Sequence, residues 1–149
     1  HHARDAWHLF GTLGYDLNLY SSALKVNSQY MHTNWFSLVL KNKCSVDDIM
    51  DRLAKNDRIA LTYKKSANSV FSFGRDHGHF GRLLNQTVVV RSSLAVRETE
   101  RGWEVLGFCF TPQDGNPLLS TVAGICWYLD RSSYGQRIQC LKPFHFTEV

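Results

Sequence analysis

The spacing of apolar residues predicts two strands in the first part of the chain. Apolar and polar positions alternate at the start of residues 15–26, which is typical of a half-buried strand. The run WFSLVL at residues 35–40 is almost continuously apolar, so we expect a strand that is covered on both faces. Residues 1–14 mix apolar and polar side chains with two glycines, and we expect this segment to be partly loose.

Helical spacing follows in three later segments. The Ser45 hydroxyl can cap free backbone N–H groups, and apolar residues then recur at i, i+3, i+4 and i+7 up to a stop at residues 56–57. A weaker helix is expected at residues 67–77. Asn116 and Pro117 are typical of a helix start, which predicts a helix from there to about residue 130.

Runs that are rich in β-branched residues predict the remaining strands. A short strand is expected at residues 58–63. Residues 87–97 and 103–110 flank a turn at residues 98–102 and are expected to pair as a hairpin. The tail at residues 131–149 has no clear pattern, apart from a candidate short strand at residues 137–141.

These elements follow one another in the order β-β-α-β-α-β-β-α. Strands that meet by hairpins, with helices between them, predict an α+β fold: one mixed, largely antiparallel sheet with helices packed on one face. A length of 149 residues indicates a single domain over residues 1–149, with a core within about residues 15–130 and a tail of uncertain structure. No G-x-G-x-x-G turn follows a first strand, so no dinucleotide-binding unit and no cofactor are expected.

The net charge, the apolar runs and the cysteine spacing bear on which partners the chain can have. Seventeen Lys and Arg against thirteen Asp and Glu give a net charge of +4, but the basic residues are scattered, so a nucleic-acid partner is not expected. No apolar run reaches about 18 residues, so no membrane span is expected. The four cysteines form no C-x-x-C pair and no zinc spacing, which favours reduced thiols in a cytoplasmic protein without a metal.

Several stretches fit a known family in their order and spacing. They are Met31-His32 after residues 16–26, SVDDIM at residues 45–50, DRIAL at residues 57–61, the strand at residues 88–96 with Arg91-Ser92-Ser93 inside it, and the helix from Pro117. HHARD at residues 1–5 is also similar to a His-His-x-x-Asp segment. Together they resemble the C-terminal catalytic domain of the archaeal-type (type II) glyceraldehyde-3-phosphate dehydrogenases, over about residues 15–130.

The resemblance implies a chemistry that this chain carries only in part. In the family, a cysteine nucleophile attacks an aldehyde beside NAD(P), and a histidine of a Met-His-x-His stretch assists proton transfer. The 149 residues include no Rossmann half and no cysteine at the nucleophile's position, and the stretch is Met31-His32-Thr33-Asn34. Asparagine cannot shuttle a proton, so His32 is the candidate catalytic relic. The alternative for His32 is a hydrogen-bonded side chain at a strand start.

Basic residues suggest a second kind of site. Arg75, His77, His79 and Arg82 stand among glycines in GRDHGHFGR, and such a loop can bind a phosphate or a carboxylate. Arg91 lies in the middle of an expected strand, where it either lies on the exposed face of the sheet or contacts an anionic ligand or a partner subunit. The alternative is a solvated loop. Two histidines and one aspartate are too few for a metal site.

Three functions follow from these observations. The preferred one is a stand-alone, catalytically incomplete dehydrogenase-type domain that forms a homo-oligomer or binds a partner or a small anionic ligand, and that is not an enzyme by itself. The alternative is a fragment of an NAD(P)-dependent dehydrogenase of a phosphorylated aldehyde, against which Asn34 argues. The second alternative is an anion-binding or RNA-binding module built from the basic residues.

Overall fold

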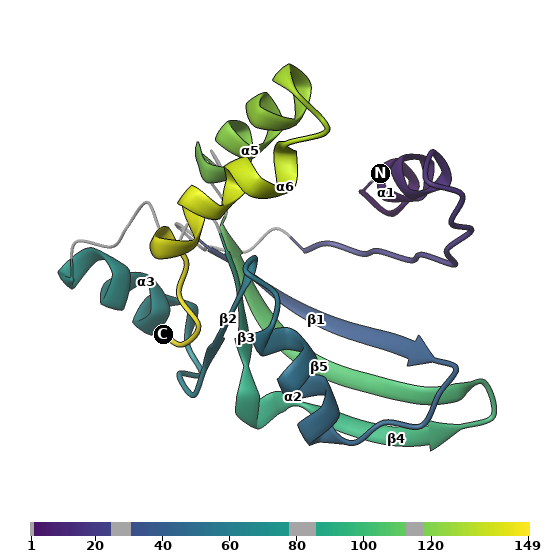
Figure 1. The fold of residues 1–149 in the computed structure, drawn as a ribbon. Coiled ribbons are helices and arrows are strands. Elements are labelled where there is room, and N and C mark those ends of the chain that lie inside the picture. Colours follow the sequence, from purple (N-terminus) through teal and green to yellow (C-terminus); the bar gives the residue numbers. More distant parts are fainter. Residues whose placement is uncertain (1, 25–30, 78–85, 113–117) are drawn as a thin grey trace.

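The computed structural model describes residues 2–24, 31–77, 86–112 and 118–149 (Figure 1). The elements are α1 (His2–Gly11), β1 (Met31–Leu40), α2 (Val46–Ala54), β2 (Ile59–Thr62), α3 (Ala67–Asp76), β3 (Thr87–Val90), β4 (Ala95–Thr99), β5 (Gly102–Pro112), α5 (Leu118–Leu129) and α6 (Tyr134–Arg137), with 3-10 helices at Arg91–Ser93 and Ile138–Phe144. The fold is α+β with one mixed sheet, as the sequence predicts, and the sheet has five described strands, which are not the five that were predicted.

Strand β5 organises the sheet. One of its sides pairs with the whole of β1, antiparallel, from Met31 opposite Pro112 to Leu40 opposite Trp103. Its other side pairs with β3 and then with β4, and β2 lies parallel to β3. The strand order is therefore β1-β5-β3-β2, with β4 beside β5.

The strand expected at residues 87–97 is interrupted by the 3-10 turn at Arg91–Ser93. Val89 pairs with Cys109 and Ala95 pairs with Leu106, so residues 90–94 lie opposite residues 107 and 108 alone. The Ser93 hydroxyl accepts a hydrogen bond from the Phe108 N–H (2.8 Å) and donates one to the Val90 carbonyl (2.7 Å). These bonds satisfy backbone groups that the interrupted ladder leaves without a partner strand.

Helices lie on both faces of the sheet, whereas the sequence analysis expected them on one face. Leu53 of α2 packs against the cluster that contains Val89, and Val70 of α3 packs with Val88 and Val90. Adjacent strand residues point to opposite faces, so α2 and α3 cover opposite faces, which we call the α2 face and the α3 face. Both faces of β3 are buried, which agrees with its sequence TVVV, in which three apolar residues follow one another without polar residues between them.

The strand expected at residues 15–26 is wrong over its described part, residues 15–24. The segment at residues 2–11 forms α1, although we expected it to be partly loose, and residues 15–24 contain no strand. None of the residues of α1 is buried, and Figure 1 shows α1 standing apart from the sheet. Alternating polarity permits a strand, but a strand also needs a neighbour, and none of the described strands reaches this segment.

The tail belongs to the core, contrary to the expected limit near residue 130. The Leu61 N–H donates to the Thr147 carbonyl (3.0 Å), and the Val149 N–H donates to the Leu61 carbonyl (2.9 Å). Residues 147–149 therefore run beside β2, and Val149 is buried in the cluster that includes Val70. The candidate strand at residues 137–141 is wrong, because this stretch continues α6 as a 3-10 helix.

Candidate functional site

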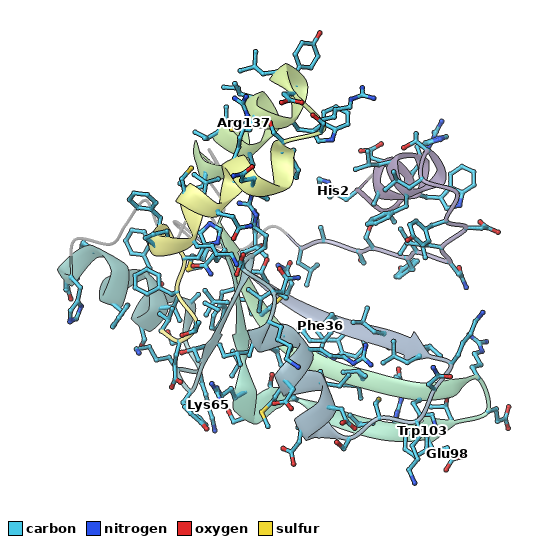
Figure 2. All side chains as sticks on the ribbon, in the orientation of Figure 1. His2, Phe36, Lys65, Glu98, Trp103 and Arg137 are labelled. Carbon is cyan, nitrogen blue, oxygen red and sulfur yellow. The ribbon has the colours of Figure 1, made fainter. Side chains whose placement is uncertain are left out.

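The candidate catalytic histidine lies on an exposed strand. His32 and Asn34 of β1 alternate along the strand with Phe36 on the same side, so all three share the α2 face. Phe36, labelled in Figure 2, packs against the buried cluster on that face. Asn34 Nδ2 donates to Thr111 Oγ1 (2.8 Å), and the exposed His32 side chain has no hydrogen bond or ion pair with another described residue. The alternative of a hydrogen-bonded histidine is therefore not what the described residues show.

The cysteine beside this stretch is Cys109, which stands opposite Asn34 in the register of β1 and β5. Its side chain is buried, and burial raises the pKa of the thiol, while a hydrogen bond with Asn34 offsets part of that rise. The thiol is therefore protonated at neutral pH, whereas a nucleophile must be a thiolate. This group of side chains is not an activated cysteine–histidine pair.

Two of the four clustered basic residues, Arg75 and His77, are described, and both contact other residues at the end of α3. Arg75 Nε lies 2.8 Å from Asp76 Oδ1, and this carboxylate raises the pKa of Arg75. His77 Nδ1 lies 2.9 Å from the Phe73 carbonyl, and its ring stacks on the Phe73 ring at 4.6 Å. His79 and Arg82 lie outside the described residues.

Arg91 is not brought to this cluster. Its guanidinium lies over the Tyr63 ring at 5.3 Å, and Nη2 is 3.2 Å from Glu148 Oε2. Tyr63 precedes the start of α3, whereas Arg75 lies at the end of that helix. Arg91 therefore joins the end of β2 to the C-terminal tail. Within the described residues, its Nε atom is buried without a hydrogen-bond partner.

The described residues provide neither a cluster of metal ligands nor a membrane-spanning helix. Those residues contain no group of three or more His, Cys, Asp or Glu side chains that could hold a metal ion. No helix among them has both the length and the apolar character needed to cross a bilayer.

A surface that the sequence analysis missed lies on the α3 face, beyond the part that α3 covers. Trp35 and Val39 of β1 and Phe108 of β5 are 60%, 50% and 45% exposed, and Trp35 stands directly opposite Phe108. We call these three residues, with the half-buried Leu106, the aromatic face. The run at residues 35–40 was expected to be covered on both faces, but β1 is an edge strand among the described strands and only part of it is covered.

A polar group lies within this face and is satisfied internally. The Ser37 hydroxyl donates to Glu104 Oε1 (2.5 Å), and Arg97 Nε donates to Oε2 (2.5 Å). These bonds, from Ser37 first and then from Arg97, lower the pKa of Glu104, whose side chain is only 14% exposed. Covering this face would therefore not strand a bare carboxylate, which would carry a large desolvation cost.

The outer edge of β1 has backbone groups that pair with no described strand. Among the described strands, β1 pairs with β5 alone, so alternate residues of this ten-residue strand present backbone N–H and C=O groups at the edge of the sheet. Such an edge is a template for pairing with another strand, unless charge or proline blocks it. MHTNWFSLVL carries no proline, Lys, Arg, Asp or Glu.

Comparisons with known proteins add no relative. No protein-family model, no curated protein and no solved structure matches this chain.

Proposed function

We propose that this chain is a self-associating domain, which pairs with a second copy of itself through the edge of β1 and the aromatic face. The observation that carries the proposal is the exposed Trp35–Phe108 pair beside an unpaired ten-residue edge. Exposed aromatic residues at the centre of a patch are typical anchors of protein interfaces. Helices α1 and α5 also expose apolar side chains, but neither offers backbone groups for pairing.

The geometry favours a two-fold pair. Antiparallel pairing of β1 with β1 of a second copy repeats the same contacts on both chains, which is the isologous arrangement of most homodimers. Each edge would supply the partners that the other edge lacks, and the two sheets would continue as one. Trp35 and Val39 of both copies would then lie on the same face of the continuous sheet.

The same proposal includes a catalytically incomplete dehydrogenase-type domain. The dehydrogenase-type part rests on the order and spacing of the sequence stretches described above. The incomplete part rests on Asn34, which stands where the family has a histidine, and on the neighbouring Cys109, a buried, protonated thiol that does not supply a nucleophile. The alternative of an anion-binding or RNA-binding module has less support, because Arg75 lies near the end of α3 whereas Arg91 contacts Tyr63 before its start, and each is paired with a carboxylate.

Sedimentation velocity tests this function. We expect the wild-type chain to sediment as a dimer, and Trp35→Ser to sediment as a monomer with an unchanged far-UV circular dichroism spectrum. Trp7→Ser is the matched control, because Trp7 is a similarly exposed tryptophan on α1, away from β1. A monomeric wild type, or dissociation by Trp7→Ser but not by Trp35→Ser, would show that the proposed surface is wrong.

A further inference from the structure

A cavity of about 380 Å³ opens on the α3 face at the margin of the aromatic face. Its floor is the sheet itself, formed by Val90 of β3 and by Phe108 and Phe110 of β5. Val90 and Phe110 are almost completely buried, so the floor is rigid and apolar. The volume lies in the range of pockets that hold small organic ligands, about 300–1,000 Å³.

Polar groups stand around this apolar floor. Three exposed polar residues line the cavity: Thr33 of β1, Ser92 of the 3-10 turn, and Lys65 of the segment before α3. None of these three side chains has a hydrogen bond or an ion pair with another described residue. The Ser93 hydroxyl also lines the cavity, but it is committed to Val90 and Phe108.

The charge of this lining selects an anion. Lys65 is the only charged residue among the described residues that line the cavity. An ammonium and two hydroxyl groups can all donate to a carboxylate, and charge-assisted hydrogen bonds of this kind are the strong ones. A bare inorganic anion would leave the aromatic floor in contact with water, so the complementary ligand also carries an apolar group.

We propose that this cavity binds a small organic carboxylate. Its carboxylate accepts hydrogen bonds from Lys65, Thr33 and Ser92, and its apolar body lies against Phe108 and Phe110. These residues differ from the basic cluster at residues 75–82, where the sequence analysis expected an anionic ligand. The site goes beyond self-association. The cavity shares Phe108 with the aromatic face, but Lys65 lies outside that face, so a change at Lys65 tests the ligand site alone.

Isothermal titration calorimetry with phenylacetate tests the site on the full chain. We expect wild-type protein to bind phenylacetate, and Lys65→Gln to weaken binding roughly tenfold or more, as expected for the loss of a charge-assisted hydrogen bond. Lys64→Gln is the matched control: it makes the same change one residue away, where the ammonium lies over the Phe73 ring instead. We expect Lys64→Gln to bind like the wild type.

Four results would overturn the proposal, three of them measured with phenylacetate or its analogue. Those three are no heat of binding with the wild type, equal binding by Lys65→Gln, and equal binding of the neutral analogue phenylacetamide. Tighter binding of inorganic phosphate than of phenylacetate would also contradict it, because the apolar body would then have no role. Sedimentation of Lys65→Gln should match the wild type, so failure of the ligand site and failure of self-association give different signatures.

Discussion

Gln86 shows how a single polar side chain can hold distant segments together. Its side chain is fully buried, at 1% exposed. Its Nε2 atom donates to the carbonyls of Asp57 (3.1 Å) and Phe146 (2.7 Å), and its Oε1 atom accepts from the Phe146 N–H (2.8 Å). The carboxamide therefore satisfies three backbone groups, and it ties the start of β3 to the tail.

We expect Gln86→Ala to destabilise the fold by roughly 1–3 kcal/mol, since buried backbone groups would lose their partners. Urea unfolding followed by circular dichroism measures the change. Gln139→Ala is the control, because Gln139 makes one exposed hydrogen bond, to the Gly135 carbonyl. Equal stability of Gln86→Ala and Gln139→Ala would mean that the carboxamide is not a structural link.

At the scale of elements, the sequence predicted correctly those helix ends and turns that depend on contacts between residues close together in the chain. Helix α2 begins where expected, because Ser45 and Asp48 form a capping box: the Asp48 N–H donates to the Ser45 hydroxyl, and the Ser45 N–H donates to the Asp48 carboxylate. The β4–β5 hairpin also matches. The break at Arg91–Ser93 was not predictable, because its bond to the Phe108 N–H joins residues far apart in the sequence.

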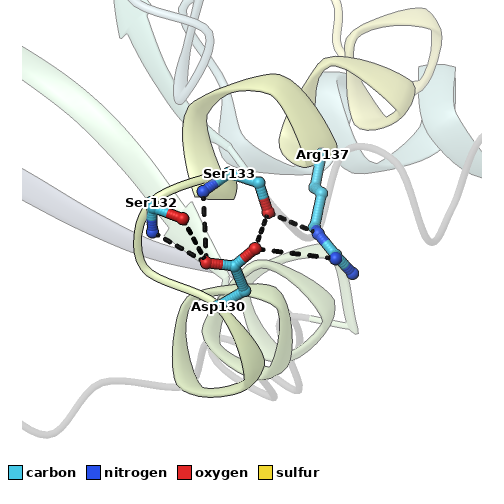
Figure 3. A network of polar contacts seen from close by, with 4 residues as sticks. All are labelled: Asp130, Ser132, Ser133 and Arg137. Carbon is cyan, nitrogen blue, oxygen red and sulfur yellow. Dashed lines mark hydrogen bonds and ion pairs between the residues drawn. The ribbon is translucent and has the colours of Figure 1, made fainter.

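The junction of α5 and α6 is a second local device (Figure 3). The Asp130 carboxylate accepts hydrogen bonds from the backbone N–H and the hydroxyl of both Ser132 and Ser133, and Arg137 lies 3.7 Å from it. These bonds, from Ser132 and then from Ser133, hold the pKa of Asp130 well below its ordinary value. The carboxylate is thus charged throughout the ordinary pH range.

The pKa of Asp130 is lower in the folded chain than in the unfolded chain, so the charged carboxylate stabilises the folded junction at pH values above the unfolded pKa. This stabilisation is lost as the pH falls through the folded pKa. We expect the Asp130 carboxyl carbon to titrate below 3.8 in an NMR pH series. The amide signals of Ser132 and Ser133 should move with it. In Asp130→Asn, these amide shifts should lose their acid dependence. Titration of wild-type Asp130 at 3.8 or above would contradict the network.

At the scale of the molecule, the sequence predicted the α+β class and the single mixed sheet, but not which segments complete it. Residues 15–24 have the alternation of a strand and pair with no described strand, whereas residues 147–149 lack it and run beside Leu61. The site was missed for a related reason. The apolar run of β1 predicted burial, but exposure depends on where a strand lies in the sheet, and β1 lies at an edge.

Two truncations test this division of the molecule. Removal of residues 1–24 should leave the midpoint of thermal unfolding nearly unchanged, because none of the residues of α1 is buried. Removal of residues 145–149 should abolish cooperative unfolding, since it deletes the buried Val149 and the partners of Leu61 and Gln86. A large loss of stability in the first variant, or none in the second, would reverse this assignment.

The contact of residues 147–149 with β2 also constrains the order of events at the ribosome. The chain leaves the ribosome from its N-terminal end, so β1 and β2 emerge long before β5 and the tail that they need. Nascent chains with such distant pairings wait in an open state that exposes apolar segments. Until residue 149 has left the ribosome, the apolar residues of β1 and β2 stay without the full set of segments that pair with them in the folded chain.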